Sequence, residues 1–405
     1  MYRHSLVFTA ACLGMLLFGI TLTTLGAVLP PLMDRYGLDR TEAGSLLALM
    51  SLGILAGSLV FGPIVDRSGY RLVLIAAALG VCLGLEGIAR APSERSLAVA
   101  VLVFGISGGV VNGSTNALVS DISGSGRSSG LALLGVFFGI GALGVPLVLG
   151  LLLRWLDYAA ILADIGLAVL LPVVFFLAIR FPPPKQPQGF PLRKAGGLLR
   201  EPTLLLLGAM LFFQSGMEIT LGGWTARYAG EVLGLNEQRA VLVLSLFWIG
   251  MMTARLVLTA LLRRRITGLV LGVSLALAVL GSALLLAPGG LATARLGLFL
   301  LGFGLAAGFP IVLGIIGEID TELTGTAFSI AFVMALTGGS ALPYLTGLLG
   351  DRYGLRASLL IVPASVLAMA ILFGVVRRRL PPRHAEGPAP EGMLDGKFPI
   401  PDSKL

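Results

Sequence analysis

Twelve long apolar runs constrain the fold of this chain more than any other feature. Each is about 20 residues long, the length that a helix needs to cross the hydrocarbon core of a bilayer. Only 12% of the 405 residues are charged and 56% are hydrophobic, whereas a soluble domain has about 25% charged residues. We predict an all-α membrane protein with twelve transmembrane helices, at about 6–33, 42–65, 72–90, 96–120, 129–153, 158–180, 203–228, 238–262, 267–287, 292–317, 325–350 and 358–376.

The first apolar run, about Ser5 to Met33, is too long for a signal peptide. Such a peptide has an apolar core of roughly 7–15 residues and a small-residue cleavage site, and no clear site of that kind follows here. We therefore expect the run to be retained as the first span. Cys12 and Cys82 both fall within apolar runs, so the sequence predicts neither a disulfide framework nor a metal site.

The two halves of the chain repeat each other at an offset of 197 residues. The positions that recur are Gly53 with Gly250, Leu59 with Leu256, Arg67 with Arg264, Pro146 with Pro343, and Gly150 with Gly347. We predict a six-helix bundle at 1–180, a Pro-rich, basic cytoplasmic linker at 181–202, a second six-helix bundle at 203–380 and a disordered cytoplasmic tail at 381–405. In membrane transporters that are built from a parallel repeat of this kind, the substrate site lies between the halves, near mid-membrane.

Basic residues are distributed unevenly between the two predicted sides. With both termini in the cytoplasm, the cytoplasmic segments hold 18 arginines and lysines and the outer segments hold 10, while Arg255 lies within a span. An excess of basic residues marks the cytoplasmic side of a membrane protein. The bias predicts a bacterial-type cytoplasmic (inner) membrane with both termini inside. It also accounts for the formal charge of +8 without a nucleic-acid partner.

A charged turn separates the second and third spans, in the stretch Gly62-Pro-Ile-Val-Asp66-Arg67-Ser-Gly69-Tyr-Arg71. The same spacing recurs at Gly347-x-x-x-Asp351-Arg352-x-Gly354-x-Arg356, which this topology places on the outer side. An Asp-Arg pair at a membrane surface is often only an interfacial anchor. Alternating access, however, needs contacts that form in one state and break in the other. We predict a gating role for Gly62, Asp66, Arg67, Gly69 and Arg71.

Glu218 is the strongest candidate for chemistry within a span, because ionisable groups there are costly and by default functional. It lies deep in the seventh span, and Gln214 is four residues earlier on the same helix face. A carboxyl group in that position can exchange a proton, which suits coupling to an ion gradient. The alternative is a structural acid that pairs with Arg255 or binds a neighbouring helix. Arg255, in the inner half of the eighth span, is assigned to gating or to such a pair.

The fourth span carries two asparagines, Asn112 and Asn116, which lie on one face at a spacing of four residues. Amides donate and accept hydrogen bonds, which suits a polyol, but asparagines also join helices to one another. Thr21 and Thr24 in the first span are weaker candidates, because threonine can bond its own helix backbone. Trp224 in the seventh span suits either a sugar face or the interfacial aromatic belt. We predict a substrate site at Asn112, Asn116, Gln214, Thr21, Thr24 and Trp224.

The G-x-x-x-D-R-x-G-x-R pattern at Gly62–Arg71 resembles the signature loop of the major facilitator superfamily. Within it, three stretches are similar to the fucose permease and sodium-dependent glucose transporter-like groups: Asn112-Gly-Ser-Thr-Asn116, Gly216-Met-Glu218 with Gly222-Gly-Trp224, and Leu246-Phe-Trp-Ile-Gly250. The resemblance implies cavity positions for Asn112, Asn116, Gln214 and Glu218. The chain departs from the fucose permease group, which has an acid at or near Asn112 and another in the first span. In that group these acids serve proton coupling and sugar binding, so the departures bear on which ion is coupled and on whether the solute is a sugar.

Three functions are consistent with the sequence. The first is uptake of a sugar or similar small polar solute, coupled to a proton or sodium cation. The second is proton-coupled efflux of drugs or other amphiphiles, which the apolar cavity helices favour. The third, a non-transporting sensor or scaffold, is disfavoured by the intact loop and the repeat. No catalytic, cofactor, metal or nucleotide motif is found, so we expect no enzyme activity. Partners should be the solute, the cation and the lipid bilayer.

Overall fold

The computed structural model describes residues 2–122, 127–183, 200–261, 267–319 and 324–379. These residues form helices and short connections, with no β-strand among them. Within this described part, twelve helical segments are long and apolar enough to cross a membrane, as the sequence predicts. Their outward faces carry large exposed apolar side chains, such as those of Leu83, Leu171 and Leu269. Such a surface suits hydrocarbon, and the fold is therefore an all-α, multi-pass membrane architecture.

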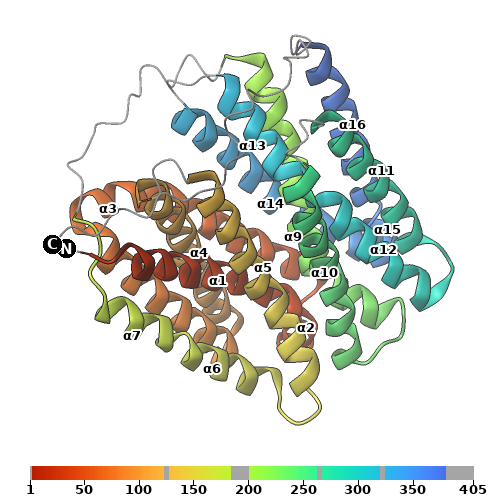
Figure 1. Ribbon diagram of the computed structural model, residues 1–405. Helices are drawn as coiled ribbons and strands as arrows, with labels where there is room; N and C mark the ends of the chain where they lie inside the picture. The colour runs from red at the N-terminus through yellow and green to blue at the C-terminus, as the bar shows by residue number, and fades with distance from the viewer. Residues whose placement is uncertain (1, 123–126, 184–199, 262–266, 320–323, 380–405) are drawn as a thin grey trace.

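Two groups of helices lie side by side, one drawn from red to yellow and the other from green to blue (Figure 1). The first half contains α1 (His4–Ala27), α2 (Leu29–Tyr36), α3 (Arg40–Arg90), α4 (Glu94–Ile122), α5 (Arg127–Leu152), α6 (Tyr158–Ala168) and α7 (Leu170–Ala178). The second contains α9 (Pro202–Glu231), α10 (Glu237–Leu261), α11 (Thr267–Leu286), α12 (Gly290–Leu305), α13 (Gly308–Ile319), α14 (Thr324–Tyr353), α15 (Leu355–Ser358) and α16 (Ile361–Arg379).

The helix boundaries differ from the predicted spans in three informative places. The first span stops at Ala27, because the chain leaves helical geometry at Val28 and restarts as α2 with prolines in its first turn. The second and third spans form one helical stretch whose single non-helical residue is Gly69. The tenth span is broken, since α12 ends at Leu305 and α13 begins at Gly308. The predicted sixth span is likewise divided, into α6 and α7 at Val169.

The helix contacts follow the 197-residue offset of the sequence. Gly105 on α4 lies so close to α3 that a Cβ there would overlap the carbonyl oxygen of Met50. Gly302 on α12 lies in the same way against the carbonyl oxygen of Phe247 on α10. Both residues of the first contact are 197 positions before those of the second. Equivalent glycines thus allow equivalent close helix crossings in the two halves.

In the described part of the chain, the two halves meet mainly where α3 packs on α14, α5 on α10, and α1 with α2 on α9. Close crossings again use glycine, as where Gly26 on α1 lies against the backbone of Gly222 on α9. At a deeper level, the Ser51 hydroxyl on α3 donates to the Gly339 carbonyl on α14 over 3.0 Å. We call the end of the bundle that carries Gly62–Arg71 the Asp66 end, and the end that carries Gly347–Arg356 the Asp351 end.

Candidate substrate and coupling site

Glu218 and Gln214 form a hydrogen-bonded pair within α9, as their spacing predicts. The Gln214 Nε2 atom donates to Glu218 Oε1 over 2.6 Å and to the Leu305 carbonyl over 2.7 Å. The second bond is possible because α12 ends at Leu305. The Leu305 carbonyl therefore does not accept the usual helical hydrogen bond from the N–H group four residues later. Glu218 is 7% exposed and Gln214 is fully buried. The carboxyl group is therefore held beside a break in the tenth span.

One atom of this pair has no partner. Gln214 Oε1 is buried and forms no hydrogen bond to any described residue. It points at Gly308, the first residue of α13, where a Cβ would overlap it. An unpaired buried acceptor is costly unless something else satisfies it. Broken membrane helices commonly supply the sites of substrates and coupling ions. At this break, the Gln214 Oε1 acceptor, the Glu218 carboxyl group and the start of α13 lie close together.

Arg255 faces the other half of the molecule. Its guanidinium lies over the ring of Phe138 on α5, with 5.3 Å from Cζ to the ring centroid. The same ring contacts Trp248 of α10 edge-on, at 6.1 Å between centroids, and Phe18 of α1 at 5.6 Å. Arg255 interacts electrostatically with Glu218, but no ion pair within 4.0 Å joins them. The predicted pairing of Arg255 with an acid is thus present only at longer range.

Asn112 and Asn116 bond to each other. Asn116 Nδ2 donates to the Asn112 carbonyl oxygen over 2.9 Å and to Asn112 Oδ1 over 3.0 Å. Both side chains are half-buried. The amide nitrogen of Asn112 and the Oδ1 atom of Asn116 form no hydrogen bond with any other described residue. The pair therefore presents one donor and one acceptor side by side.

The remaining predicted substrate residues are engaged in packing. Thr21 and Thr24 are fully buried, and each hydroxyl donates to the backbone of its own helix, to the carbonyls of Leu17 and Ile20. Trp224 is also fully buried, and its Nε1 atom donates to the Pro343 carbonyl on α14 over 3.0 Å. A fully buried indole is not part of an interfacial belt. Contact of these three residues with a substrate stays a prediction.

The predicted gate at the Asp66 end has its turn at Gly69, with φ 74° and ψ 161°. Glycine adopts this conformation without the penalty that a Cβ brings. Arg71 donates to the Leu177 carbonyl at the end of α7, in the same half. Arg67 is exposed, and a Cβ at Gly62 would meet no described atom within 4 Å. The Asp66 side chain lies outside the described part of the structure.

The second copy of the motif holds the two halves together, a role that the sequence reasoning missed. Asp351 accepts hydrogen bonds from the backbone N–H groups of Arg40, over 3.0 Å, and Thr41, over 2.7 Å, at the start of α3. The Thr41 hydroxyl donates to it as well. Asp351 thereby caps a helix of the other half, beside the local cap that Asp39 supplies.

Ion pairs join the halves at the same end. Arg40 Nη2 lies 3.0 Å from Glu231 Oε2, and Arg227 Nη1 lies 2.9 Å from Asp34 Oδ1. Between described residues of the two halves, the hydrogen bonds and ion pairs all lie at this end or near the middle. Direct contacts between the halves therefore hold the Asp351 end closed in this conformation.

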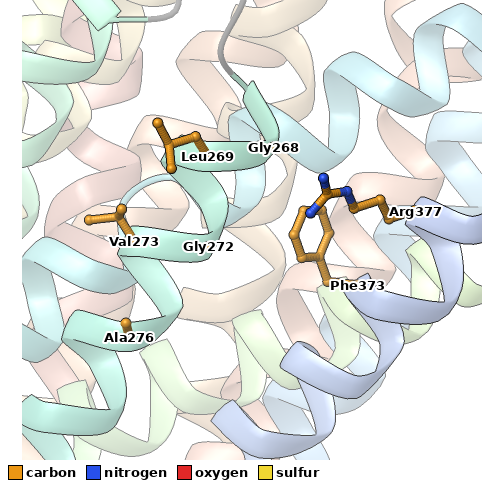
Figure 2. A pocket seen from close by; sticks show the side chains of 7 residues that line it. All are labelled: Gly268, Leu269, Gly272, Val273, Ala276, Phe373 and Arg377. Carbon is orange, nitrogen blue, oxygen red and sulfur yellow. The ribbon is translucent and has the colours of Figure 1, made fainter. Parts of the chain in front are cut away.

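A surface pocket of about 440 Å³ lies between α11 and α16, and none of the predicted site residues lines it (Figure 2). Gly268, Gly272, Val273, Phe373 and Arg377 line it. Leu269 and Val273 on its rim are more than half exposed. The pocket opens on the outward apolar surface, where lipid would fill it, so we assign it no part in the site.

The sequence contained a signal for the helix break that prediction did not use. The run Leu305-Ala-Ala-Gly308-Phe-Pro310 is fully apolar, so hydropathy alone extends the span through it. A Gly/Pro interruption within an apolar run is nevertheless a pointer to a broken membrane helix. Together with Gln214 and Glu218, it would have placed the break beside the buried carboxyl group.

Comparison with known proteins identifies relatives over most of the chain. The family model described as Major Facilitator Superfamily matches residues 11–342. Sodium-dependent glucose transporter 1A of Mus musculus is 26% identical over an alignment of 412 positions that covers 91% of this chain and 94% of the relative. The gallate transporter of Pseudomonas putida is 28% identical over an alignment of 308 positions that covers 66% of this chain and 67% of the relative.

A solved structure has the same fold. A bacterial homologue of the human lysosomal transporter Spinster, in an inward-facing and unoccupied conformation, matches with a TM-score of 0.75 and 15% identity. The match covers 93% of this chain and 97% of that structure. At this level of identity the likeness concerns the fold alone.

Proposed function

We propose that this chain, which belongs to the Major Facilitator Superfamily, couples the movement of a small polar solute to a cation through Glu218. Membership makes it a membrane transporter and not an enzyme. The observation that carries the proposal is the Gln214–Glu218 pair at the break between α12 and α13. We take the cation to be a proton, because one buried carboxyl group is sufficient to carry it. Sodium is the alternative, since carboxylate and amide oxygens suit a hard cation.

Two features favour a polar solute, such as a sugar. The Asn112–Asn116 pair offers one donor and one acceptor, which a hydroxyl group can satisfy at once. One relative bears the name of a glucose transporter and another that of a gallate transporter, and both named solutes carry several hydroxyl groups. Neither the direction of transport nor the solute follows from these names.

Proton-coupled efflux of amphiphiles is the second candidate. It is favoured by the aromatic cluster Phe18, Phe138, Phe247 and Trp248, which lies where the halves meet. Flat apolar solutes bind well against such rings. Competition by sugars and by lipophilic cations for binding to the purified protein would separate the two candidates.

The charge distribution suggests which side of the membrane is closed. If the basic-residue bias holds, the Asp66 end, the linker and both termini face the cytoplasm. The closed Asp351 end is then the outer end, and the conformation is inward-facing. We propose that Gly62, Asp66, Arg67, Gly69 and Arg71 close the inner end in the opposite state, and that Arg255 contributes to that movement.

The substitution Glu218→Gln tests the coupling role. It keeps the side-chain shape and fixes the state in which the group carries no charge. In proteoliposomes, this variant should retain counterflow exchange but lose accumulation driven by an imposed proton gradient, or by a sodium gradient if sodium is the ion. Glu86→Gln is the matched control, because Glu86 lies near the end of its span and pairs with Arg90 over 3.0 Å. If the Glu218→Gln variant still accumulated solute fully along an imposed gradient, Glu218 would have a structural role only and no role in coupling.

A further inference from the structure

Two hydrogen-bond donors without partners lie beside one aromatic ring at the contact between the halves. The Arg255 guanidinium lies over Phe138 and forms no hydrogen bond or ion pair with any described residue. Trp248 Nε1 is buried and has no partner in the same part of the chain, and the Trp248 ring contacts the same Phe138. Both donors are on α10, seven residues apart, so they lie on one helix face.

These two groups share a chemical property that narrows the substrate. Guanidinium and indole N–H groups only donate, so a ligand that satisfies both must supply acceptors. A positive charge within a membrane span is costly unless it is compensated. Glu218 compensates it only at longer range, and that carboxyl group is already bound to Gln214. The missing partner of Arg255 is thus an anionic acceptor that no described residue provides within hydrogen-bonding distance.

The positions of the rings define the body of such a ligand. The Phe138 ring centre lies 5.3 Å from the Arg255 Cζ atom and 6.1 Å from the centre of the Trp248 ring. The guanidinium and the indole thus both adjoin one aromatic ring, a set of side chains that suits a ligand with a flat apolar body and an anionic end. Phe138 belongs to one half, whereas Arg255 and Trp248 belong to the other. A ligand bound among them therefore contacts both halves, as alternating access requires.

We propose that the solute is a small organic anion with an aromatic or otherwise flat body, whose carboxylate binds Arg255 and whose body lies along Phe138 and Trp248. The proposal rests on the transport function proposed above and names the substrate class of the same site. Bidentate binding of a carboxylate is the geometry that arginine provides and lysine does not. The competing explanation is that water alone serves Arg255, which is only partly buried.

Binding of matched probes to the purified protein in nanodiscs tests this directly. The probes are 4-hydroxybenzoate and its neutral analogue 4-hydroxybenzamide, benzoate and benzamide, and glucose, each followed by calorimetry and thermal shift. We expect each carboxylate to bind at least about 10-fold more tightly than its amide. Arg255→Gln should weaken carboxylate binding by about 10- to 100-fold, as expected for a charge-assisted hydrogen bond. It should leave the weak binding of the amides unchanged.

Two further variants keep the result interpretable. Arg255→Lys keeps the charge if Arg255→Gln folds poorly, and it should lose part of the carboxylate preference. Arg154→Gln is the matched control, since Arg154 also lies over an aromatic ring, that of Trp155, but is exposed in a loop at the Asp351 end. Equal binding of acid and amide, binding of glucose alone, binding of none of the probes, or an unchanged Arg255→Gln would each overturn the proposal. Anion binding without gradient-driven accumulation would instead count against the coupled transport function.

Discussion

The two copies of the Gly-x-x-x-Asp-Arg-x-Gly-x-Arg motif have the same local structure and different surroundings. Gly69 and Gly354 adopt nearly the same conformation, with φ 74° and ψ 161° in one and φ 81° and ψ 155° in the other. Arg71 donates to the last turn of α7 and Arg356 to the last residue of α11. Each copy therefore ties together two helices of its own half.

The difference lies in what the other half contributes. At the Asp351 end, Gly347 lies against the Arg40 backbone and Asp351 caps the start of α3. At the Asp66 end, no described atom approaches Gly62. The comparison teaches that the glycine and the arginines build the turn, whereas closure of an end depends on a helix start from the opposite half. We infer that the two copies act in opposite conformations.

The largest effect is expected from a side chain at Gly347. A Cβ there would overlap the Arg40 carbonyl oxygen, which is backbone and cannot turn away. Gly347→Val should disfavour the closed Asp351 end by about 1–3 kcal/mol, and so move the population toward the opposite state. Gly62→Val meets nothing in this conformation and should move the population the other way. Thiol labelling of a cysteine introduced at each end, in a background without Cys12 and Cys82, would measure both. If Gly347→Val and Gly62→Val shifted the accessibility of the two ends in the same direction, the inference that the two motif copies act in opposite conformations would be wrong.

A smaller effect is expected from Asp351→Asn. Asparagine keeps one acceptor oxygen and loses the charge, so the hydrogen bonds from Arg40 and Thr41 become neutral ones. The closed Asp351 end should lose about 1 kcal/mol, which is about fivefold in population. Asp66→Asn should slow transport more than it lowers the yield of folded protein. Wild-type accessibility of the Asp351 end in Asp351→Asn would show that this carboxylate is not part of the closure.

The smallest effect is expected at the arginines that stay within one half. Arg71→Ala and Arg356→Ala each remove a hydrogen bond to a helix carboxyl terminus near the surface, which contributes about 0.5 kcal/mol. Both should lower the thermal stability slightly and by similar amounts. Neither should change which end is accessible to thiol reagents. A clear change in accessibility in either variant would mean that these arginines also bridge the two halves.

Most of the fold could be predicted from the sequence, because hydropathy and the 197-residue offset depend only on residue type and spacing. The Gln214–Glu218 pair was also predictable, since residues four apart share a helix face. The break after Leu305 was not found by hydropathy, as Ala306 and Ala307 are as apolar as the rest of that span. The cap that Asp351 supplies to α3 joins residues some 310 positions apart. No local pattern contains such a contact.

The orientation of side chains within the site was the least predictable part. Trp224 has one donor, and only the packing of α9 on α14 determines that it binds Pro343. The missing partner of Arg255 is likewise a property of the assembled helices, because the sequence offers Glu218 as a counter-ion and the packing keeps the two groups beyond ion-pair distance. Thr21 and Thr24 behave as threonines in helices commonly do, since each bonds its own backbone.

Distance measurements between spin labels test the central claim, that the second motif copy holds the Asp351 end closed while the two ends move reciprocally. Labels at Arg95 and Arg239 report on the Asp351 end, and labels at Arg180 and Arg200 report on the Asp66 end; all four positions are exposed. The account predicts one short, narrow distance at the Asp351 end of the wild-type protein. In Gly347→Val, that distance should lengthen while the distance at the Asp66 end shortens. An unchanged Asp351 end, or a change of both distances in the same direction, would contradict the account.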